Sequence, residues 1–212
     1  MDLYIIGAGN VGGFLAYHAN QFGKYILKGF IDDDESKQGK YIYDLPVIGK
    51  VDILLNIDKP FAVAVAIGNP INKKRIVELL KQNKQVVFPS FIHPSVWIGQ
   101  KVIIKKGCII YPGVTINYET EIDDFVTINM NASVGHNCRL NNFSTLSPGV
   151  NCGGFTVIGE ESFLGIGSCT IQSIKIGNKS IVGAGAIVIR DIPDNVVVAG
   201  VPAKIIKSGL ND

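Results

Sequence analysis

The sequence has little net charge, few aromatic residues and no long apolar run. Its 212 residues carry 20 Lys and Arg against 18 Asp and Glu, which leaves a formal net charge of +2. A balance this close to zero argues against a nucleic-acid partner and against binding to a charged membrane surface. No apolar stretch approaches the length that spans a bilayer, and the N-terminus MDLYIIGAGN lacks the positive segment of a signal peptide. We therefore expect a cytoplasmic protein.

Cysteine is also scarce, and its spacing matches neither a metal site nor a disulfide framework. Cys108, Cys138, Cys152 and Cys169 form no C-x-x-C pair, and His136 alone is a nearby histidine. Isolated cysteines of this kind are typical of buried, reduced thiols. We expect no metal site.

Hydrophobic residues make up 47% of the chain, and their rhythm changes near residue 90. Residues 1–90 alternate short apolar runs with helical patterns, which predicts a small Rossmann-like α/β domain with a parallel sheet. One amphipathic helix should have Ile71, Ile76, Leu79 and Leu80 on one side, whereas residues 33–58 follow no clear pattern. The expected strands are DLYIIGAG, YILKGFIDDD, FAVAVAIG and QVVFPSFI, and the expected helices are VGGFLAYHANQFG and PINKKRIVELLKQN.

Residues 91–212 form the second predicted domain, and most of it repeats every six positions. Of the seventeen positions spaced by six from 92 to 188, fifteen are aliphatic, and chance would give roughly a quarter of that at ordinary apolar usage. The residue two positions earlier in each hexad is mostly small or β-branched, as a second inward-facing strand site requires. One rung cannot bury its apolar face alone, so the rungs must stack around a shared core.

This six-residue period resembles the left-handed parallel β-helix of hexapeptide-repeat acyltransferases, in which three hexads make one triangular coil. The left hand is implied by the resemblance, because the general rule for parallel crossovers gives the opposite hand. About five coils fit between residues 98 and 188.

His136 has a defined phase in this repeat. Val134 points inward, so Gly135 begins the corner and His136 faces outward, where it is either an ordinary surface residue or a catalytic one. One coil later, 18 residues on, Gly154 shares its column and lies beside Gly153. Two glycines at this place would leave room for a slim ligand to approach the backbone.

The stretches SVGHNCRLNNFSTLSPGVNCGGFTVIGEESFLGIGS and IVGAGAIVIRDIPDNVVVAGVPAKII carry a closer resemblance. They are similar to the sialic acid O-acetyltransferase and nucleotide-4-amino-sugar N-acetyltransferase family, and the similarity covers nearly the whole chain. It implies acetyl-CoA as co-substrate, a homotrimer, and His136 as the general base, a role worth about 10²–10⁴-fold in rate. No cysteine or serine is placed beside His136 as a nucleophile, so we expect direct attack of the acceptor on the thioester.

One position departs from the family pattern. Members commonly have Asp or Glu directly after the histidine, whereas this chain has Asn137. An amide can orient an imidazole but does not stabilise its cation as a carboxylate does. The hypothesis is therefore a less basic His136, or a carboxylate that arrives from elsewhere, such as a neighbouring subunit.

The resemblance also implies contacts with coenzyme A at Thr145, Ile166 and Ala184, within FSTLS, LGIGS and VGAGA. Ordinary β-helix packing would account for the same three residues. Lys204 and Lys207 could meet the phosphates of the cofactor, or they belong to a solvated tail.

A glycine motif opens the chain. Gly7-Ala8-Gly9-Asn10-Val11-Gly12 fits G-x-G-x-x-G between a strand and a helix, and Asp32 follows about twenty residues later. The pattern predicts phosphate at the helix N-terminus and the acid on a ribose hydroxyl, although about ninety residues make only half of a dinucleotide fold. In the sugar N-acetyltransferases the matching positions hold the nucleotide of the sugar. Here they are Gly9, Asn10, Val11, Asp32, Asp33 and Gly68.

The leading hypothesis is transfer of acetyl from acetyl-CoA to the 4-amino group of a nucleotide-linked amino-deoxy sugar for surface glycan synthesis. O-acetylation of sialic acid is the alternative within the family. A non-catalytic trimer that binds nucleotide sugars and a nicotinamide-dependent reductase are alternatives of other classes. The sequence indicates no second domain with a substrate pocket for a reductase.

Overall fold

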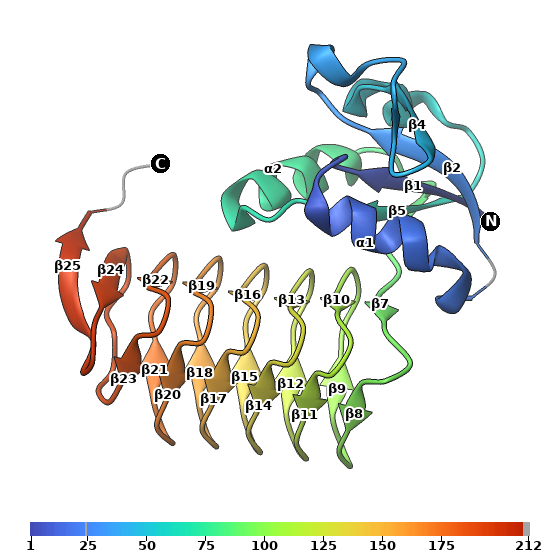
Figure 1. The fold of residues 1–212 in the computed structure, drawn as a ribbon. Helices are drawn as coiled ribbons and strands as arrows, with labels where there is room; N and C mark the ends of the chain where they lie inside the picture. The colour runs from blue at the N-terminus through green and yellow to red at the C-terminus, as the bar shows by residue number, and fades with distance from the viewer. Residues whose placement is uncertain (24, 210–212) are drawn as a thin grey trace. The chain divides into compact units, whose positions relative to one another are not determined.

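The computed structural model describes residues 1–23 and 25–209, which divide into two compact units (Figure 1). The first unit is Met1–Phe91 and the second begins at Ile92. In the described residues, no helix is long and apolar enough to cross a membrane.

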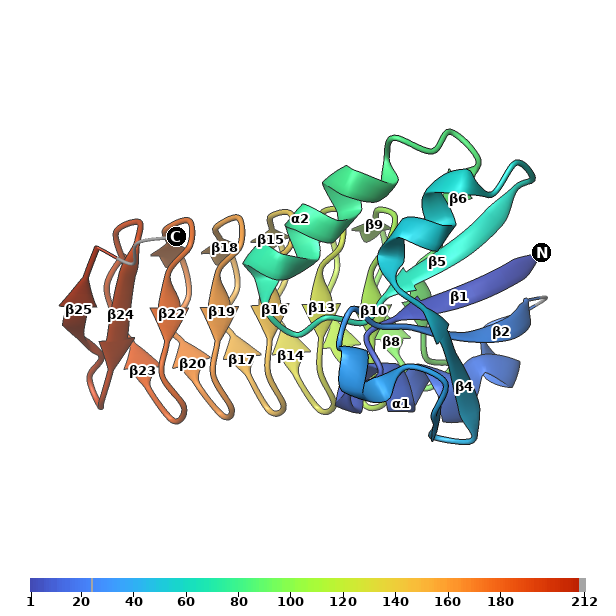
Figure 2. The same ribbon diagram turned by 90° about the horizontal axis from the view of Figure 1, so that it is seen from above.

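The first unit is an α/β fold around one mostly parallel sheet with the strand order β3-β4-β2-β1-β5-β6. Its strands are β1 (Asp2–Ile6), β2 (Ile26–Ile31), β3 (Tyr41–Ile42), β4 (Leu45–Gly49), β5 (Phe61–Val65) and β6 (Val86–Val87). Its helices are α1 (Asn10–His18) and α2 (Pro70–Leu80), with short 3₁₀ turns η1 (Ala19–Gln21), η2 (Glu35–Lys37) and η3 (Val51–Asn56). Figure 2 shows α1 and α2 on opposite sides of the sheet, so its central strands are covered on both faces.

Two details of this unit differ from the prediction. Ile71 is 44% exposed, because five residues of helix turn it about 140° away from the buried Ile76; the buried side of α2 holds Lys73, Val77 and Leu80 as well. The segment QVVFPSFI is two short strands, β6 and β7 (Phe91–Ile92). Pro89 separates them, because proline has no N–H for a strand ladder.

The second unit is the predicted parallel β-helix, built from two-residue strands at six-residue intervals. Three sheets run along it, and each strand pairs with the one 18 residues later, as in Ile116 with Val134. The strands after β7 are β8 (Trp97–Ile98), β9 (Ile103–Ile104), β10 (Ile109–Ile110), β11 (Thr115–Ile116), β12 (Glu121–Ile122), β13 (Thr127–Ile128), β14 (Ser133–Val134), β15 (Arg139–Leu140), β16 (Thr145–Leu146), β17 (Asn151–Cys152), β18 (Val157–Ile158), β19 (Phe163–Leu164), β20 (Cys169–Thr170), β21 (Lys175–Ile176), β22 (Ile181–Val182) and β23 (Ile187–Val188).

Both predicted sets of inward residues form the core of the β-helix. From Ile110 to Val188 every sixth residue is buried, whereas Ile98 in the first coil is 42% exposed because no coil precedes it. Some of the inward hydroxyl groups donate to carbonyl oxygens of the next coil, which offsets the cost of burying them. Ser162 Oγ donates to Gly177 O at 2.6 Å, and Ser180 Oγ donates to Pro193 O at 2.7 Å.

The C-terminal part ends in a hairpin. Strand β24 (Val196–Ala199) adds in parallel to β22, and β25 (Lys204–Ser208) pairs antiparallel with β24. Lys204 and Lys207 are exposed, but they lie on this paired strand. The two lysines are therefore solvated, as the second interpretation expects, but on a paired strand instead of in a tail.

Candidate active site

His136 lies at the corner that follows β14 and is surrounded by aromatic rings and a glycine. Its imidazole stacks on Tyr118, one coil earlier, with ring centroids 5.2 Å apart and an interplanar angle of 12°. The ring of Phe155 meets it edge-on at 5.0 Å. The histidine is half-buried, and the phase of the repeat places it outside the core as predicted.

The two glycines beside His136 have a packing role that differs from the predicted ligand passage. A Cβ atom at Gly154 would lie 2.7 Å from Nε2 of His136, so the imidazole itself fills that space. A Cβ atom at Gly153 would lie 2.5 Å from the backbone nitrogen of Gln172 in the next coil. Gly154 is therefore needed for the position of the catalytic candidate, and Gly153 for the approach of two coils.

A chain of hydrogen bonds connects His136 to a carboxylate of the same chain. His136 Nδ1 is 2.9 Å from Asn137 Oδ1, and the amide nitrogen Nδ2 of Asn137 donates to Glu119 Oε2 at 3.0 Å. The other carboxylate oxygen, Oε1, accepts from Lys101 Nζ at 2.8 Å. The hydrogen bonds from Lys101 and Asn137 lower the pKa of Glu119. A carboxylate of the same chain thus reaches Asn137, the neighbour of His136, without a contribution from another subunit.

Lys101 and Glu119 belong to no motif and were not among the predicted site residues, although their spacing carries a signal. Both precede Asn137 at intervals of 18 residues, so the three occupy one column of successive coils. Their backbones share the left-handed conformation of that corner, with φ of 58°, 55° and 54°. Side chains that leave equivalent corners in stacked coils are brought within hydrogen-bonding distance of each other.

Cys138 follows Asn137 in the sequence, but its side chain is buried in the core of the β-helix. Its thiol lies 3.7 Å from His136 O and 3.3 Å from Gly153 O. Burial raises the pKa of this thiol, which makes the nucleophilic thiolate scarce. This agrees with direct attack and with a structural role for Cys138.

The predicted coenzyme A contacts belong to one sheet of the β-helix, with Thr145 on a strand and the other two at the corner that follows the strands. Ile166 is 61% exposed and Ala184 is also exposed; they occupy the same corner one coil apart. Thr145 lies on strand β16 and is only 4% exposed. Within one chain, His136 follows a strand of a different sheet from β19 and β22, which precede Ile166 and Ala184. The chain alone therefore does not bring these residues together with His136.

A small cavity of about 170 Å³ lies near the C-terminal end of the β-helix. Arg190 and Lys204 line it, together with Ile189, Pro202 and Ala203. One of the two predicted phosphate lysines, Lys204, thus shares a cavity with a second cation.

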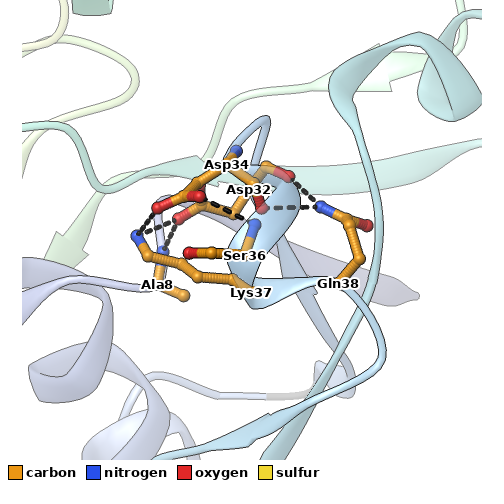
Figure 3. A network of polar contacts seen from close by, with 6 residues as sticks. All are labelled: Ala8, Asp32, Asp34, Ser36, Lys37 and Gln38. Atoms are coloured by element: carbon orange, nitrogen blue, oxygen red, sulfur yellow. Dashed lines mark hydrogen bonds and ion pairs between the residues drawn. The ribbon is translucent and has the colours of Figure 1, made fainter.

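In the first unit, hydrogen bonds to Asp32 join the glycine loop to the turn that follows β2 (Figure 3). Its Oδ2 accepts from Ala8 N at 2.9 Å and from Lys37 Nζ at 2.8 Å, and its Oδ1 accepts from Asp34 N at 3.0 Å. Burial alone would raise the pKa of Asp32, but the hydrogen bonds from Lys37, Asp34 and Ala8 outweigh it and lower the pKa. Asp33 accepts from Val51 N at 3.0 Å and holds the start of η3.

The glycine motif takes the predicted place between β1 and α1. Gly7 has φ +97°, a left-handed conformation that favours glycine. A Cβ atom at Gly12 would collide with Gly7 O and with the ring of Phe30, so this glycine permits close packing of helix and strand. Gly9 is the N-cap of α1, and Asn10 Oδ1 accepts from the hydroxyl of Tyr43 at 3.2 Å.

A cavity of about 220 Å³ opens at the carboxyl ends of β1, β2 and β5. Asp32 and Asp33 line it on one side, and Asn72 and Arg75 from α2 line it on another; the remaining lining residues are Ile6, Gly7, Ile31, Val51, Ile67 and Ile76. Gly9 is the N-cap of α1, Asn10 and Val11 begin that helix, and Gly68 follows β5; none of the four lines the cavity. Arg75 is a phosphate-binding candidate that the sequence analysis missed, because its helix carries no motif.

Comparison with known proteins places these features in context. The family model for the PglD N-terminal domain matches residues 2–80. The acetyltransferase domain of PglB from Neisseria gonorrhoeae is 35% identical, with a TM-score of 0.88 over 97% of this chain and 99% of that one; it has also been solved with acetyl coenzyme A. A comparison with curated proteins finds no match.

A second group of solved structures is similar along the same length. PerB from Caulobacter crescentus, in complex with CoA and GDP-perosamine, is 30% identical, with a TM-score of 0.88 over 98% of each chain. WeeI from Acinetobacter baumannii is 25% identical, with a TM-score of 0.85 over 97% of this chain and 100% of that one. The likeness confirms the predicted fold class, a small α/β domain followed by a left-handed β-helix.

Proposed function

Because this chain belongs to the hexapeptide-repeat sugar N-acetyltransferases, we propose that it acetylates the 4-amino group of a nucleotide-linked amino-deoxy sugar from acetyl-CoA. The observation that carries the proposal is the pairing of two features in one chain. An outward histidine with a hydrogen-bonded Nδ1 lies on the β-helix, and a cavity with Asp32, Asp33 and Arg75 lies in the α/β unit.

His136 is the general base of the proposed reaction. The amine nitrogen of the acceptor attacks the thioester carbonyl carbon while Nε2 of His136 takes a proton from the amine. The C–S bond then breaks, and the departing coenzyme A sulfur receives that proton from the imidazolium. A base held in this way contributes about 10²–10⁴-fold.

The α/β unit binds the nucleotide of the acceptor. Backbone N–H groups at the start of α1, near Gly9, Asn10 and Val11, suit a phosphate, since the N-terminal end of a helix attracts anions. Arg75 offers a positive charge from α2, and the carboxylate of Asp33 and the turn at Gly68 complete the predicted set.

Coenzyme A contacts Thr145, Ile166 and Ala184 in this proposal, in a homotrimer. Support for the trimer comes from the separation of Ile166 and Ala184 from His136 within one chain, which an adjacent subunit would overcome. The proposal places this reaction in the cytoplasm.

An acceptor panel tests the proposal. Acetyl-CoA is offered with UDP-, dTDP- and GDP-linked 4-amino sugars and with free sialic acid, and products are identified by mass spectrometry. We expect an acetamide on one nucleotide-linked amino sugar and no product with sialic acid. An acetyl ester of sialic acid would instead establish the alternative, and binding of the nucleotide sugars without any product would favour the non-catalytic trimer.

A further inference from the structure

We propose that Glu119, which accepts a hydrogen bond from Lys101, is a positioning residue. It fixes the tautomer of His136 through the side-chain amide of Asn137. The proposal rests on the function proposed above for His136. It assigns a role to two residues that neither the histidine motif nor the glycine motif includes.

The donor and acceptor groups of His136, Asn137 and Glu119 allow only one orientation of the Asn137 amide. An ionised carboxylate only accepts hydrogen bonds, so the end of the Asn137 amide that faces Glu119 must be the donating Nδ2. The accepting oxygen, Oδ1, then faces the imidazole at 2.9 Å. An acceptor in this place requires a hydrogen on Nδ1 of His136, and in a neutral imidazole that leaves the lone pair on Nε2.

Lys101 keeps Glu119 in the required state. It bonds the far oxygen of the carboxylate at 2.8 Å, and the hydrogen bonds of Lys101 and Asn137 lower the pKa of Glu119. The carboxylate therefore stays ionised at the pH at which an imidazole is neutral. When His136 takes a proton, the bond from Nδ1 to Asn137 Oδ1 strengthens, and the amide transmits part of the carboxylate's field to the cation.

The other groups near the imidazole do not fix its tautomer. Tyr118 meets it face-on and Phe155 edge-on, so each offers a ring to the histidine. Cys138 contacts the backbone oxygen of His136 and not the ring. The Asn137–Glu119 chain is the hydrogen-bonded route to Nδ1 that the described residues provide.

The decisive variant is Glu119→Gln. Lys101 still donates, so it holds the oxygen of the new glutamine amide, and the nitrogen of that amide faces Asn137. Two donating groups would then meet, and Asn137 has to turn its amide over and present Nδ2 to His136. The proton moves to Nε2 and the base is lost. Glu119→Ala only removes the constraint, so E119A leaves a mixture of both orientations.

The expected order of kcat is therefore wild type, then E119A, then E119Q. We expect about a tenfold loss for E119A and about a hundredfold loss for E119Q, within the range that a general base contributes. A merely structural role predicts the reverse order, because glutamine resembles glutamate more than alanine does. Glu121→Gln is the matched control, since Glu121 lies on the same coil outside this network, 4.0 Å from Arg139, and should retain wild-type kcat.

A second change should restore the tautomer. In the double variant E119Q/N137D, the glutamine amide donates to the new aspartate, whose other oxygen accepts from Nδ1 of His136. We expect E119Q/N137D to recover most of the kcat that E119Q loses. N137D alone should remain impaired, because two carboxylates would then lie about 3 Å apart and share a proton.

The tautomer itself is measured by NMR on protein with ¹⁵N-labelled histidine at alkaline pH, where the imidazoles are neutral. The chain has three histidines, and the His136 signals are assigned by their loss in His136→Gln. Wild type and E119Q/N137D should carry the proton on Nδ1, and E119Q on Nε2. An unchanged tautomer in E119Q overturns the proposal, whatever the acceptor panel yields. A shifted tautomer combined with an active His136→Ala variant would instead overturn the function proposed for His136 and leave the relay intact.

Discussion

The β-helix and the α/β unit hold their functional side chains in different ways. In the β-helix, Lys101, Glu119 and Asn137 meet because each stands 18 residues from the next on a regular scaffold. In the α/β unit, Asp32 is held by Ala8 of the glycine loop and by Lys37 of η2, at unrelated sequence separations. A regular scaffold fixes atoms to the accuracy that proton transfer needs, whereas loops suit recognition of a bulky ligand. Changes in the β-helix should therefore alter kcat, and changes in the α/β unit should alter the KM for the acceptor.

The strongest test of this division is His136→Ala. Without the base, kcat should fall about 10²–10⁴-fold, while the acceptor KM stays within a few-fold of the wild-type value because the α/β unit is untouched. Steady-state kinetics with the acceptor from the panel provides both constants. His93→Ala is the matched control: this β-helix histidine bonds Ser95 and lies in the first coil, so its loss should leave kcat unchanged. An H136A enzyme that keeps most of its turnover would contradict the proposed mechanism.

Much of the β-helix could be predicted because each residue has one of only six environments. The inward positions, the outward direction of His136 and the column it shares with Gly154 all follow from the period. The period does not show which atoms meet across a column. That Gly154 accommodates the imidazole, and that Glu119 reaches Asn137, depends on side-chain length and on the left-handed backbone of the corner.

The α/β unit was less predictable because its contacts come from residues that share no period. The glycine motif and Asp32 were found, since they belong to a fixed local pattern. Lys37, which neutralises Asp32, and Arg75, which enters the cavity from the side of α2, carry no such pattern. The error at Ile71 has a different origin, because the helical period itself places this residue about 140° from the buried Ile76.

Gly154→Ala is the next largest expected effect and shows how closely the β-helix positions its base. The new methyl would overlap Nε2 and Cε1 of His136, which lie 2.7 and 2.8 Å from the Cβ position. The imidazole must therefore move, and a displacement near 1 Å costs up to about 10²-fold in rate. We expect kcat to fall about 10- to 100-fold with little change in the acceptor KM.

A double-mutant cycle is the control for this variant. All three heavy atoms nearest the Cβ position of Gly154 belong to His136, so the substitution should cost nothing further in an H136A background. Equal losses in the wild-type and H136A backgrounds would mean that the methyl disturbs the coil and not the histidine.

Asp32→Asn should have the smallest effect and should act on the other constant. The amide oxygen can replace only some of the bonds to Ala8 N, Lys37 Nζ and Asp34 N, so the loop positions loosen. We expect the acceptor KM to rise about tenfold, which is about 1.4 kcal/mol, with kcat nearly unchanged.

Because the pKa of Asp32 is lowered from its ordinary 3.8, its contribution to stability is complete above that value and is lost as the pH falls through the folded-state pKa. Chemical denaturation should therefore show wild type more stable than D32N at neutral pH, with the gap closing below about pH 4. A gap that persists in acid, or a loss confined to kcat, would show that Asp32 neither stabilises the loop as an anion nor serves acceptor binding.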